Sequence, residues 1–316
     1  MPGIKAHDFL WGRLRSPDLD QAEEFLVDFG LSRVARTKDK LFMRGTDPVH
    51  HIHVTELGPS KFLGFGYQLA SEDDLKQAAR LPGASGVENI DEPGGGKRVR
   101  LTDPNGYQIE LVAGLEKVAE LPVPEYKLNW GAEKLRRAGT LMRIARGPAQ
   151  VKRIGHGVLM STDIAKTLKW YRENLGFLVS DDVYEGEDKS KVIGSFNRLD
   201  RGADYVDHHV FFCIAGPKTG LNHVSFEVRD FDDVMIGHEY LKAKGKYKHV
   251  WGIGRHVLGS QIYDYWQDPW GRVHEHWTDT DILNASAKPN QVSTTEGFTS
   301  QWGQEIPQEF IEHAIP

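Results

Sequence analysis

The same pattern of turn residues occurs once in each half of the chain, in "YWQDPWGRVHEHW" (residues 265–277) and in "LTDPNGYQIELV" (residues 101–112). Each contains Asp-Pro-x-Gly, which is typical of a type I turn followed by glycine in the left-handed region, as in a three-residue hairpin loop. In each, the fourth residue after the glycine is a glutamate, Glu110 in the first half and Glu275 in the second. The repeated hairpin indicates a duplicated domain.

The similarity between the halves extends upstream of these hairpins. Residues 50–75 run alongside residues 208–234, and residues 9–34 match residues 154–179. Each half therefore reads as strand, helix and strands, followed by the same order again. The pattern predicts an α+β fold of two tandem domains, each built from paired βαβββ modules.

Helix signals support this division. After Asp163, apolar residues recur at the spacing i, i+4, i+7 and i+11, which predicts one buried helix face. Ser71 and Asp230 are expected to begin further helices, the second of which ends at Gly245. We expect a first domain over residues 1–115, a linker over 116–150, a second domain over 151–285 and a polar C-terminal tail over 286–316.

Composition limits the range of functions. The 316 residues are 39% hydrophobic and 27% charged with a net charge of −6, which argues against nucleic acid or an anionic membrane as the main partner. No run of 18 apolar residues predicts a transmembrane helix, and the start of the chain lacks a signal-peptide pattern. The single cysteine, Cys213, fits a reducing compartment, so we expect a cytoplasmic protein.

Three residues from separate elements are candidate metal ligands. His156 lies in an apolar strand directly before a helix, His223 holds the corresponding place in the next strand–helix unit, and Glu275 lies in the last strand of that unit. Related units bring their first strands together, so these side chains can face one point. Two histidines and one carboxylate with open positions are typical of non-haem Fe(II) oxygenases. The competing interpretation for any one histidine is a surface or hydrogen-bonded core residue.

Strand alternation separates the three polar residues of the cluster His274-Glu275-His276. Successive side chains on a strand point to opposite faces, so Glu275 faces one side while His274 and His276 face the other. We expect these two histidines to face solvent or to hydrogen-bond the next strand.

The second half resembles the type I extradiol ring-cleaving dioxygenases of the vicinal oxygen chelate superfamily, the group of catechol 2,3-dioxygenase and dihydroxybiphenyl dioxygenase. The resemblance implies a vicinal oxygen chelate, or glyoxalase-like, fold. It also implies extradiol (meta) cleavage of a catecholic ring by O2, with both oxygen atoms inserted, in aromatic catabolism. One departure is Asp264, where the family usually has an aliphatic residue. The residues that carry the resemblance are Gly254-Arg255-His256, Tyr265, Asp268-Pro269-x-Gly271 and Glu275, with the spacing from His209 to His223.

The resemblance also assigns roles. His156, His223 and Glu275 would hold Fe(II), with Mn(II) as a family variant, at about one ion per chain in the second domain. His209 matches the acid–base histidine, while its neighbour His208 is expected to point to the opposite side of the strand. The alternative for His209 is a hydrogen-bonded strand residue.

His256 and Tyr265 match residues that line the site and hydrogen-bond the substrate oxygens. A loop over residues 269–271 pairs Tyr265 with Glu275, which puts their side chains on one face. The alternative for both residues is a place in the core. Family members are often homo-oligomers, commonly tetramers, and we expect the same here.

The first half lacks two of the three ligands. Aligning the repeats places Trp11 opposite His156 and Gly64 opposite His223, so the first domain is not expected to hold a metal. The cluster of His50, His51 and His53 is interpreted as structural because alternation splits it.

Candidate walls of the substrate pocket are Val158, Trp251, Leu258 and Tyr205, and Trp302 in the tail is a candidate for closing it. Trp251 stands where carboxylate-recognising relatives carry arginine. This favours an uncharged catechol with an alkyl or aryl substituent.

Three alternatives remain on the sequence alone. Glyoxalase-type isomerases of the same superfamily draw ligands from both halves of the site, which the missing ligands of the first half argue against. A metal-free binding module leaves the joint occurrence of His209, His256 and Tyr265 without a reason. A zinc hydrolase does not account for the tyrosine.

Overall fold

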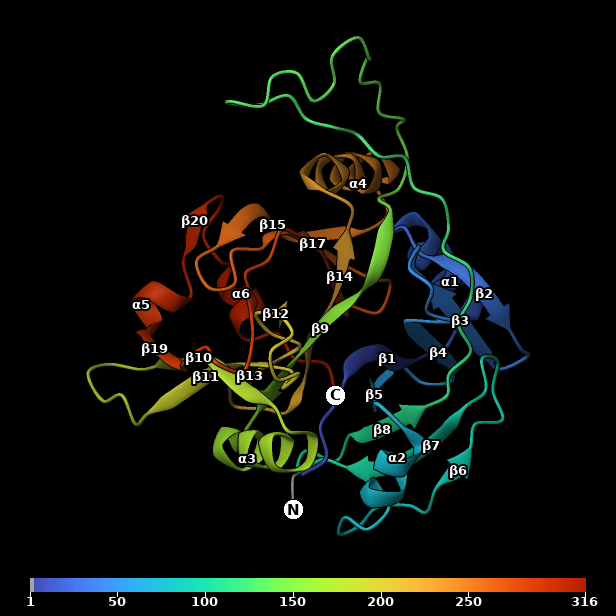
Figure 1. Cartoon of the computed structure of the whole chain (residues 1–316), viewed down its shortest axis with the longest axis vertical. Coiled ribbons are helices and arrows are strands. Elements are labelled where there is room, and N and C mark those ends of the chain that lie inside the picture. Colours follow the sequence, from blue (N-terminus) through green and yellow to red (C-terminus); the bar gives the residue numbers. More distant parts are fainter. Residues whose placement is uncertain (1–2) are drawn as a thin grey trace.

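The computed structural model of the chain describes residues 3–316. Within them, the two halves of the sequence form two large sheets that lie beside each other, with the N-terminal half at the right of Figure 1 and the C-terminal half at the left. Helices α1 to α4 pack on these sheets. None of the described helices is long and apolar enough to cross a membrane.

The N-terminal sheet has eight strands in the order β2-β3-β4-β1-β5-β8-β7-β6 among the described residues. Its strands are β1 (Asp8–Ser16), β2 (Ser32–Arg36), β3 (Lys40–Arg44), β4 (His53–Leu57), β5 (Lys61–Gln68), β6 (Glu88–Asn89), β7 (Lys97–Thr102) and β8 (Gln108–Ala113).

The C-terminal sheet has ten strands in the order β19-β10-β11-β13-β9-β14-β17-β16-β15-β20 over the same described range, and β12 (Val206–Asp207) pairs separately with β18 (Ile282–Leu283). The strands of the large sheet are β9 (Val151–Ser161), β10 (Leu178–Tyr184), β11 (Val192–Arg198), β13 (Phe211–Ala215), β14 (Gly220–Val228), β15 (Lys248–His256), β16 (Ile262–Gln267), β17 (Val273–Thr278), β19 (Asn290–Ser293) and β20 (Ser300–Trp302).

Three of the helices begin at the capping residues that the sequence indicates, and one of them ends at the predicted glycine. Asp163 caps α3 by accepting the backbone N–H of Lys166, and Ser71 and Asp230 cap α2 and α4 in the same way. Gly245 ends α4 in the left-handed conformation, which costs glycine little. The helices are α1 (Leu19–Asp28), α2 (Glu72–Ala78), α3 (Ile164–Leu175), α4 (Phe231–Lys244), α5 (Thr294–Gly297) and α6 (Gln308–Ile311).

Strand pairing confirms the duplication. In the first half, β1 pairs antiparallel with β5, while β4 and β8 join them in parallel on either side. In the second half, β9 and β14 pair antiparallel and are flanked in parallel by β13 and β17. The predicted α+β fold of paired βαβββ modules is therefore the observed one.

The two Asp-Pro turns have matching geometry. The carboxylate of Asp268 accepts the backbone N–H groups of Trp270 and Arg272, and Gly271 has φ 83°. Asp103 and Gly106 repeat this arrangement, with φ 88° at the glycine. Each turn fixes the register of the hairpin that presents a glutamate on its second strand.

The two halves share one apolar core, and His274 and His276 lie inside it. Both imidazoles are buried. His276 hydrogen-bonds the carbonyl of Phe29 through Nε2 at 2.6 Å and stacks on its ring, while Nε2 of His274 lies 3.4 Å from Nε2 of His53. The sequence expectation of solvent exposure or a bond to the next strand is wrong, because the face of β17 opposite Glu275 is covered by the N-terminal half.

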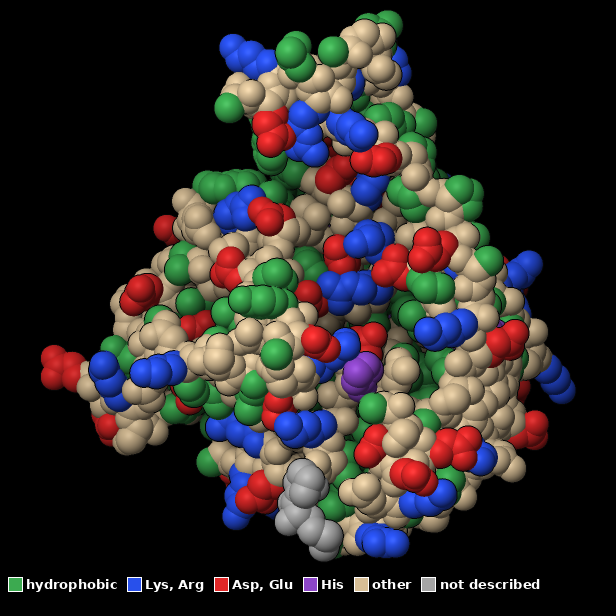
Figure 2. Space-filling model, viewed as in Figure 1, with side chains coloured by type: hydrophobic (Ala, Val, Ile, Leu, Met, Phe, Trp, Pro, Cys, Tyr) green, Lys and Arg blue, Asp and Glu red, His purple; other side chains and the backbone are tan. Residues whose placement is uncertain are grey.

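The segment between the halves, residues 114–150, contains no named helix or strand and forms the projection at the top of Figure 1. Hydrophobic side chains stand exposed on it, among them Trp130, Leu135 and Leu141. Elsewhere on the face drawn in Figure 2, basic and acidic side chains are interspersed. The C-terminal tail behaves differently, since its strands β19 and β20 extend both edges of the second sheet.

Candidate metal centre

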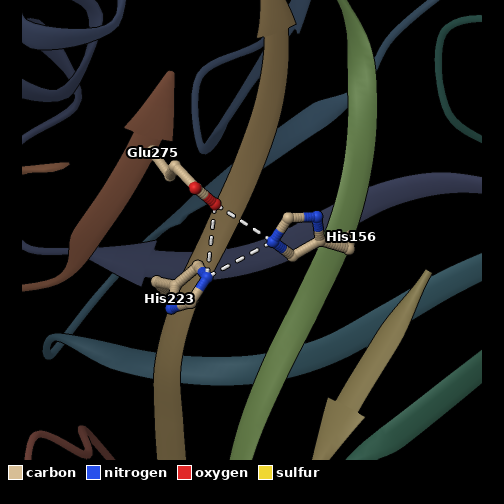
Figure 3. A group of neighbouring side chains, drawn as sticks. All are labelled: His156, His223 and Glu275. Carbon is tan, nitrogen blue, oxygen red and sulfur yellow. Dashed lines mark hydrogen bonds and ion pairs between the residues drawn. The ribbon is translucent and has the colours of Figure 1, made fainter. Parts of the chain in front are cut away.

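His156, His223 and Glu275 converge from β9, β14 and β17 (Figure 3). Nε2 of His156 lies 3.0 Å from a carboxylate oxygen of Glu275, and Nε2 of His223 lies 3.4 Å from the same oxygen. The two Nε2 atoms are 3.4 Å apart. All three side chains are buried. The arrangement brings two imidazole nitrogens and a carboxylate to one point, as expected from the spacing.

The strand registers explain this convergence. Ser225 pairs with His156 across β14 and β9, and with Glu275 across β14 and β17, so these three residues form one row across the sheet. His223 lies two residues before Ser225 and therefore points to the same face. Ser225 supports the row directly, because its hydroxyl donates to Glu275 at 2.5 Å.

Asn222 orients His223, a role that the sequence did not indicate. Its amide N–H groups donate to the carbonyls of His313 and Phe310 at 2.8 and 3.2 Å, so its oxygen faces Nδ1 of His223 at 2.6 Å. Nδ1 must then carry the proton, which leaves the lone pair on Nε2 for a metal. The segment around α6 thereby fixes the tautomer of a ligand candidate.

The charge balance of the site fits a divalent cation. Within the described chain, the ion-pair partners of the buried Glu275 carboxylate are histidines, and one of its oxygens has no hydrogen-bond partner. Burial lowers the pKa of His156 despite the attraction of Glu275, so the ring is neutral near pH 7, the form that binds metals. A buried carboxylate beside the neutral imidazole of His156 lacks the positive charge that burial demands.

The N-terminal half supplies that charge from the protein itself. The register of β1, β5 and β8 places Trp11 where the other half has His156 and Gly64 where it has His223. Nε1 of Trp11 donates to Glu110 at 3.0 Å, and Nε of Arg13 donates to the same oxygen at 3.0 Å. A guanidinium thus compensates Glu110. That this half holds no metal stays a prediction, and Arg13 gives it a physical reason.

A pocket opens beside the three ligand candidates. Of the expected walls, Val158, Trp251 and Leu258 line it, whereas Tyr205 and Trp302 do not. Tyr205 is 67% exposed and Trp302 is 43% exposed, so these two are not retained as pocket walls. Further lining comes from His156, Phe196, His209, Phe212, Ile214, Asn222, His223, His256, Gln261, Tyr265, Gly297, Phe298, Thr299, Ile306, Phe310 and Ile311.

The tail closes the pocket with residues other than Trp302. Phe298, which follows α5, and Phe310 on α6 both face the cavity. Their spacing follows no helical or strand period, so no sequence pattern marks them. Phe196 and Phe212, on β11 and β13, stack with ring centroids 4.0 Å apart and form part of another wall.

His209 lies at the edge of the ligand group, with its ring centroid 4.2 Å from that of His156. Its Nδ1 is 3.1 Å from Nδ1 of His208, and Nε2 of His208 is 2.6 Å from a carboxylate oxygen of Asp181. The expectation that His208 points away is wrong, because residues 208–210 lie between β12 and β13 rather than within a strand.

This chain of contacts assigns tautomers. The Asp181 carboxylate only accepts, so Nε2 of His208 carries a proton. In a neutral His208 ring, Nδ1 then accepts the proton of Nδ1 of His209. Nε2 of His209 is left with its lone pair, in a residue that lines the pocket. Asp181 is held in turn by the amide of Asn290 at 2.8 Å.

His256 and Tyr265 occupy the remaining side of the site. Nε2 of His256 lies 2.9 Å from the hydroxyl of Tyr265 and 3.7 Å from Glu275. Tyr265 pairs with Glu275 across the hairpin, as the three-residue loop predicts. Burial raises the pKa of Tyr265 well above its ordinary value, so the phenol keeps its proton and acts as a donor.

Comparisons with known proteins agree with this geometry. Residues 153–275 match the family model of the Glyoxalase/Bleomycin resistance protein/Dioxygenase superfamily. The chain is 30% identical to Metapyrocatechase 2 of Cupriavidus necator over 95% of this chain and 90% of that protein. It is 25% identical to a manganese-dependent 2,3-dihydroxybiphenyl 1,2-dioxygenase of Geobacillus genomosp. 3, over 81% and 79% of the two chains.

Solved structures share the fold. Homoprotocatechuate 2,3-dioxygenase of Arthrobacter globiformis has a TM-score of 0.78 at 19% identity, covering 100% of this chain and 93% of that one. An Mn(II)-bound glyoxalase of Novosphingobium aromaticivorans has a TM-score of 0.77 at 23% identity, covering 99% and 97%. At these identities the structures show the fold alone.

The fold and the sequence relatives together define a vicinal oxygen chelate protein. Within that superfamily, the chain belongs to the extradiol ring-cleaving dioxygenases, and the isomerase and binding-module alternatives are not favoured.

Proposed function

We propose that the chain cleaves an uncharged catechol with an apolar substituent, using a divalent metal held by His156, His223 and Glu275. The reaction class is extradiol (meta) cleavage of a catecholic ring with O2. The observation that carries the ligand assignment is the meeting of Nε2 of His156, Nε2 of His223 and the carboxylate of Glu275, where the two histidines line the pocket. Fe(II) is the first choice of metal and Mn(II) the second.

A divalent metal held by His156, His223 and Glu275 would supply Lewis acidity for a chelating diol and electron transfer between the diol and O2. The protein supplies the proton handling. Nε2 of His209 is the base that takes the proton of a substrate hydroxyl, since its lone pair belongs to a residue lining the pocket. The hydroxyl of Tyr265, next to His256, donates to a substrate oxygen.

The remaining lining supports an apolar ring substituent. None of the described residues that line the pocket is lysine or arginine, and Phe196, Phe212 and Phe298 supply much of its wall. A charged carboxylate on the substrate would have to be buried there without a partner, which is costly. Trp251 strengthens this preference, since its indole N–H donates to the carbonyl of Gln304 and presents the ring to the pocket.

The proposal is tested by loading the metal-free protein anaerobically with Fe(II) or Mn(II) and measuring O2 uptake. The substrates are catechol, alkyl- and aryl-substituted catechols, and a carboxylated catechol. We expect O2 uptake and a yellow ring-fission product with the apolar substrates, and weak turnover of the carboxylated one. No O2 uptake with any catechol and either metal would contradict the assignment of the site.

A test variant and a control variant separate loss of a ligand from general misfolding. His223→Gln removes a ligand candidate and is expected to abolish metal retention. His7→Gln changes a histidine far along the chain from the three ligand candidates and should leave metal content and O2 uptake unchanged. The homo-oligomeric state, expected to be a tetramer, stays a prediction that light scattering on the eluting protein tests, and the cytoplasmic location also stays a prediction.

A further inference from the structure

We propose that His238, His249 and Asp264 form a second divalent-metal site, suited to a borderline transition metal such as Zn2+. The three residues come from α4, β15 and β16, and their ligand atoms all lie within 4.8 Å of one another. None of them lines the substrate pocket or belongs to the catalytic ligand group. The site does not rest on the proposed function.

The distances suit a small coordination sphere. Nε2 of His249 lies 2.8 Å from one carboxylate oxygen of Asp264, and Nδ1 of His238 lies 3.2 Å from both. The two imidazole rings are perpendicular, with centroids 4.9 Å apart. Ligands at about 2.0–2.2 Å around tetrahedral zinc are roughly 3.3 Å from one another. Small side-chain adjustments therefore suffice to place an ion between these atoms.

The charge of Asp264 favours a bound cation. Its carboxylate is fully buried, and within the described chain its ion-pair partners are the two histidines. Burying a carboxylate is costly unless a positive charge accompanies it. A bound divalent ion would supply that charge. The indole N–H of Trp266 donates to the carboxylate at 2.6 Å and fixes its orientation.

Solvent reaches the cluster through the histidines. The His249 side chain is 30% exposed and that of His238 is 17% exposed, whereas the carboxylate behind them is closed off. An ion can therefore arrive from outside and keep water at its remaining positions. Histidine nitrogens and a carboxylate are suitable ligands for zinc.

The position indicates a structural or regulatory role. Asp264 precedes Tyr265 on β16, and the ladder with β15 pairs Tyr265 with Trp251 and Asp264 with Gly252. An ion on this side would tie α4 to the hairpin whose other face presents Trp251 and Tyr265 to the substrate pocket. Asp264, the departure from the expected pattern, thereby acquires a function as a metal ligand.

The test measures zinc stoichiometry in protein that already holds its catalytic metal. The wild type and the double variant His238→Gln/His249→Gln are dialysed against low micromolar Zn2+, and bound metals are then counted by elemental analysis. We expect one more zinc per chain in the wild type than in the double variant, with equal catalytic-metal content. Zinc should also raise the unfolding temperature of the wild type alone. Equal zinc content in the two proteins would overturn the proposal.

Further variants distinguish a second site from zinc bound at the catalytic ligands. Asp264→Asn should also lose the zinc. Because the Asp264 carboxylate is buried, this variant can misfold, and in that case the double histidine variant remains the primary test. His7→Gln, a change outside both clusters, should retain the zinc. His223→Gln should lose the catalytic metal and still bind zinc at His238 and His249. Loss of the extra zinc in His223→Gln would place it at the catalytic ligands and refute a second site.

Discussion

Arg13 lies against Glu110 inside the N-terminal half, with Nε 3.0 Å from the carboxylate, where the C-terminal half sets imidazoles against Glu275. One fold thus surrounds equivalent buried carboxylates in two ways. A permanent side-chain cation compensates Glu110, and in the proposed function a divalent ion would do the same for Glu275.

Arg13→Met should strongly destabilise the protein. The change removes one of the cations that pair with Glu110 and with Glu92, which keep Arg98 and Lys40 respectively. We expect a loss that approaches the roughly 3–5 kcal/mol of a broken buried pair. Urea denaturation measures the loss, and metal content should stay unchanged in the folded protein. Arg33→Met, which removes an exposed partner of Glu23, is the matched control and should cost little. Equal effects of the two changes would show that burial of the Arg13 pair is unimportant.

Asp181→Asn should slow turnover without loss of metal. An asparagine can donate to Nε2 of His208, which reverses the proton order along His208 and His209 and places a proton on Nε2 of His209. General-base catalysis would be lost, so we expect kcat to fall on the order of 10²-fold with KM nearly unchanged.

The matched control for this variant is Asp204→Asn, at an exposed aspartate paired with Arg201. Steady-state O2 uptake and circular dichroism separate a catalytic effect from misfolding. An unchanged kcat in Asp181→Asn would show that this aspartate does not set the tautomer of His209, or that His209 is not the base.

His274→Ala should reduce stability and Glu275→Gln should reduce metal binding, because neighbouring residues on β17 face opposite sides. His274 packs against Phe25 and Phe226, so truncation is expected to cost roughly 3 kcal/mol of stability while metal is retained. Glu275→Gln should lose the metal, and its free energy of unfolding should change less than that of His274→Ala. Elemental analysis and urea denaturation read out the two effects, and equal metal loss in both variants would invalidate the assignment of faces.

Acid should destabilise the N-terminal half through Glu92. Burial alone would raise the pKa of this carboxyl, but attraction from Arg13 and Lys40 lowers it from 4.5 to about 2. A depressed pKa stabilises the fold fully above the unfolded value of 4.5, and this contribution is lost as the pH falls towards about 2.

The shift corresponds to roughly 3 kcal/mol at full effect. Urea denaturation across this pH window should show a steeper loss of stability for the wild type than for Glu92→Gln. Parallel curves for the two proteins would mean that Glu92 titrates alike in the folded and unfolded states.

Gln261 should select among ring substituents. Its side chain is 1% exposed, lines the pocket and has both amide atoms without a hydrogen-bond partner. Gln261→Leu should therefore lower kcat/KM for catechols whose substituent hydrogen-bonds and preserve it for alkyl-substituted ones. The ratio of kcat/KM for the two substrate types is the measurement, and a ratio equal to that of the wild type would remove Gln261 from the specificity determinants.

Sequence patterns can predict those features that depend on local periodicity. Alternation along β17 places Glu275 and His274 on opposite faces, and the Asp-Pro turn pairs Tyr265 with Glu275. Strand alternation does not indicate what covers each face of a strand, so it cannot predict the burial of His274 and His276 against the N-terminal half. His208 also escapes prediction, because the chain leaves regular strand geometry just where it occurs.

The support of the ligands is beyond prediction for another reason. Asn222 acts through carbonyl groups of Phe310 and His313, and a carbonyl is present at every residue, so no residue type marks it. The same applies to the pocket walls, since Phe298 and Phe310 lie in a tail without a hydrophobic period. The size of Trp302 makes it the obvious candidate in the tail, yet the observed fold gives that place to smaller aromatic rings.

The link between Asn222 and the carbonyl of His313 has a consequence for how the protein is made. The two residues are 91 positions apart in the chain. During translation, His223 emerges long before the segment that fixes its ring. The pocket can therefore gain its final shape only once residues 310–313 have left the ribosome, and until then the ring of His223 lacks the contact that orients it.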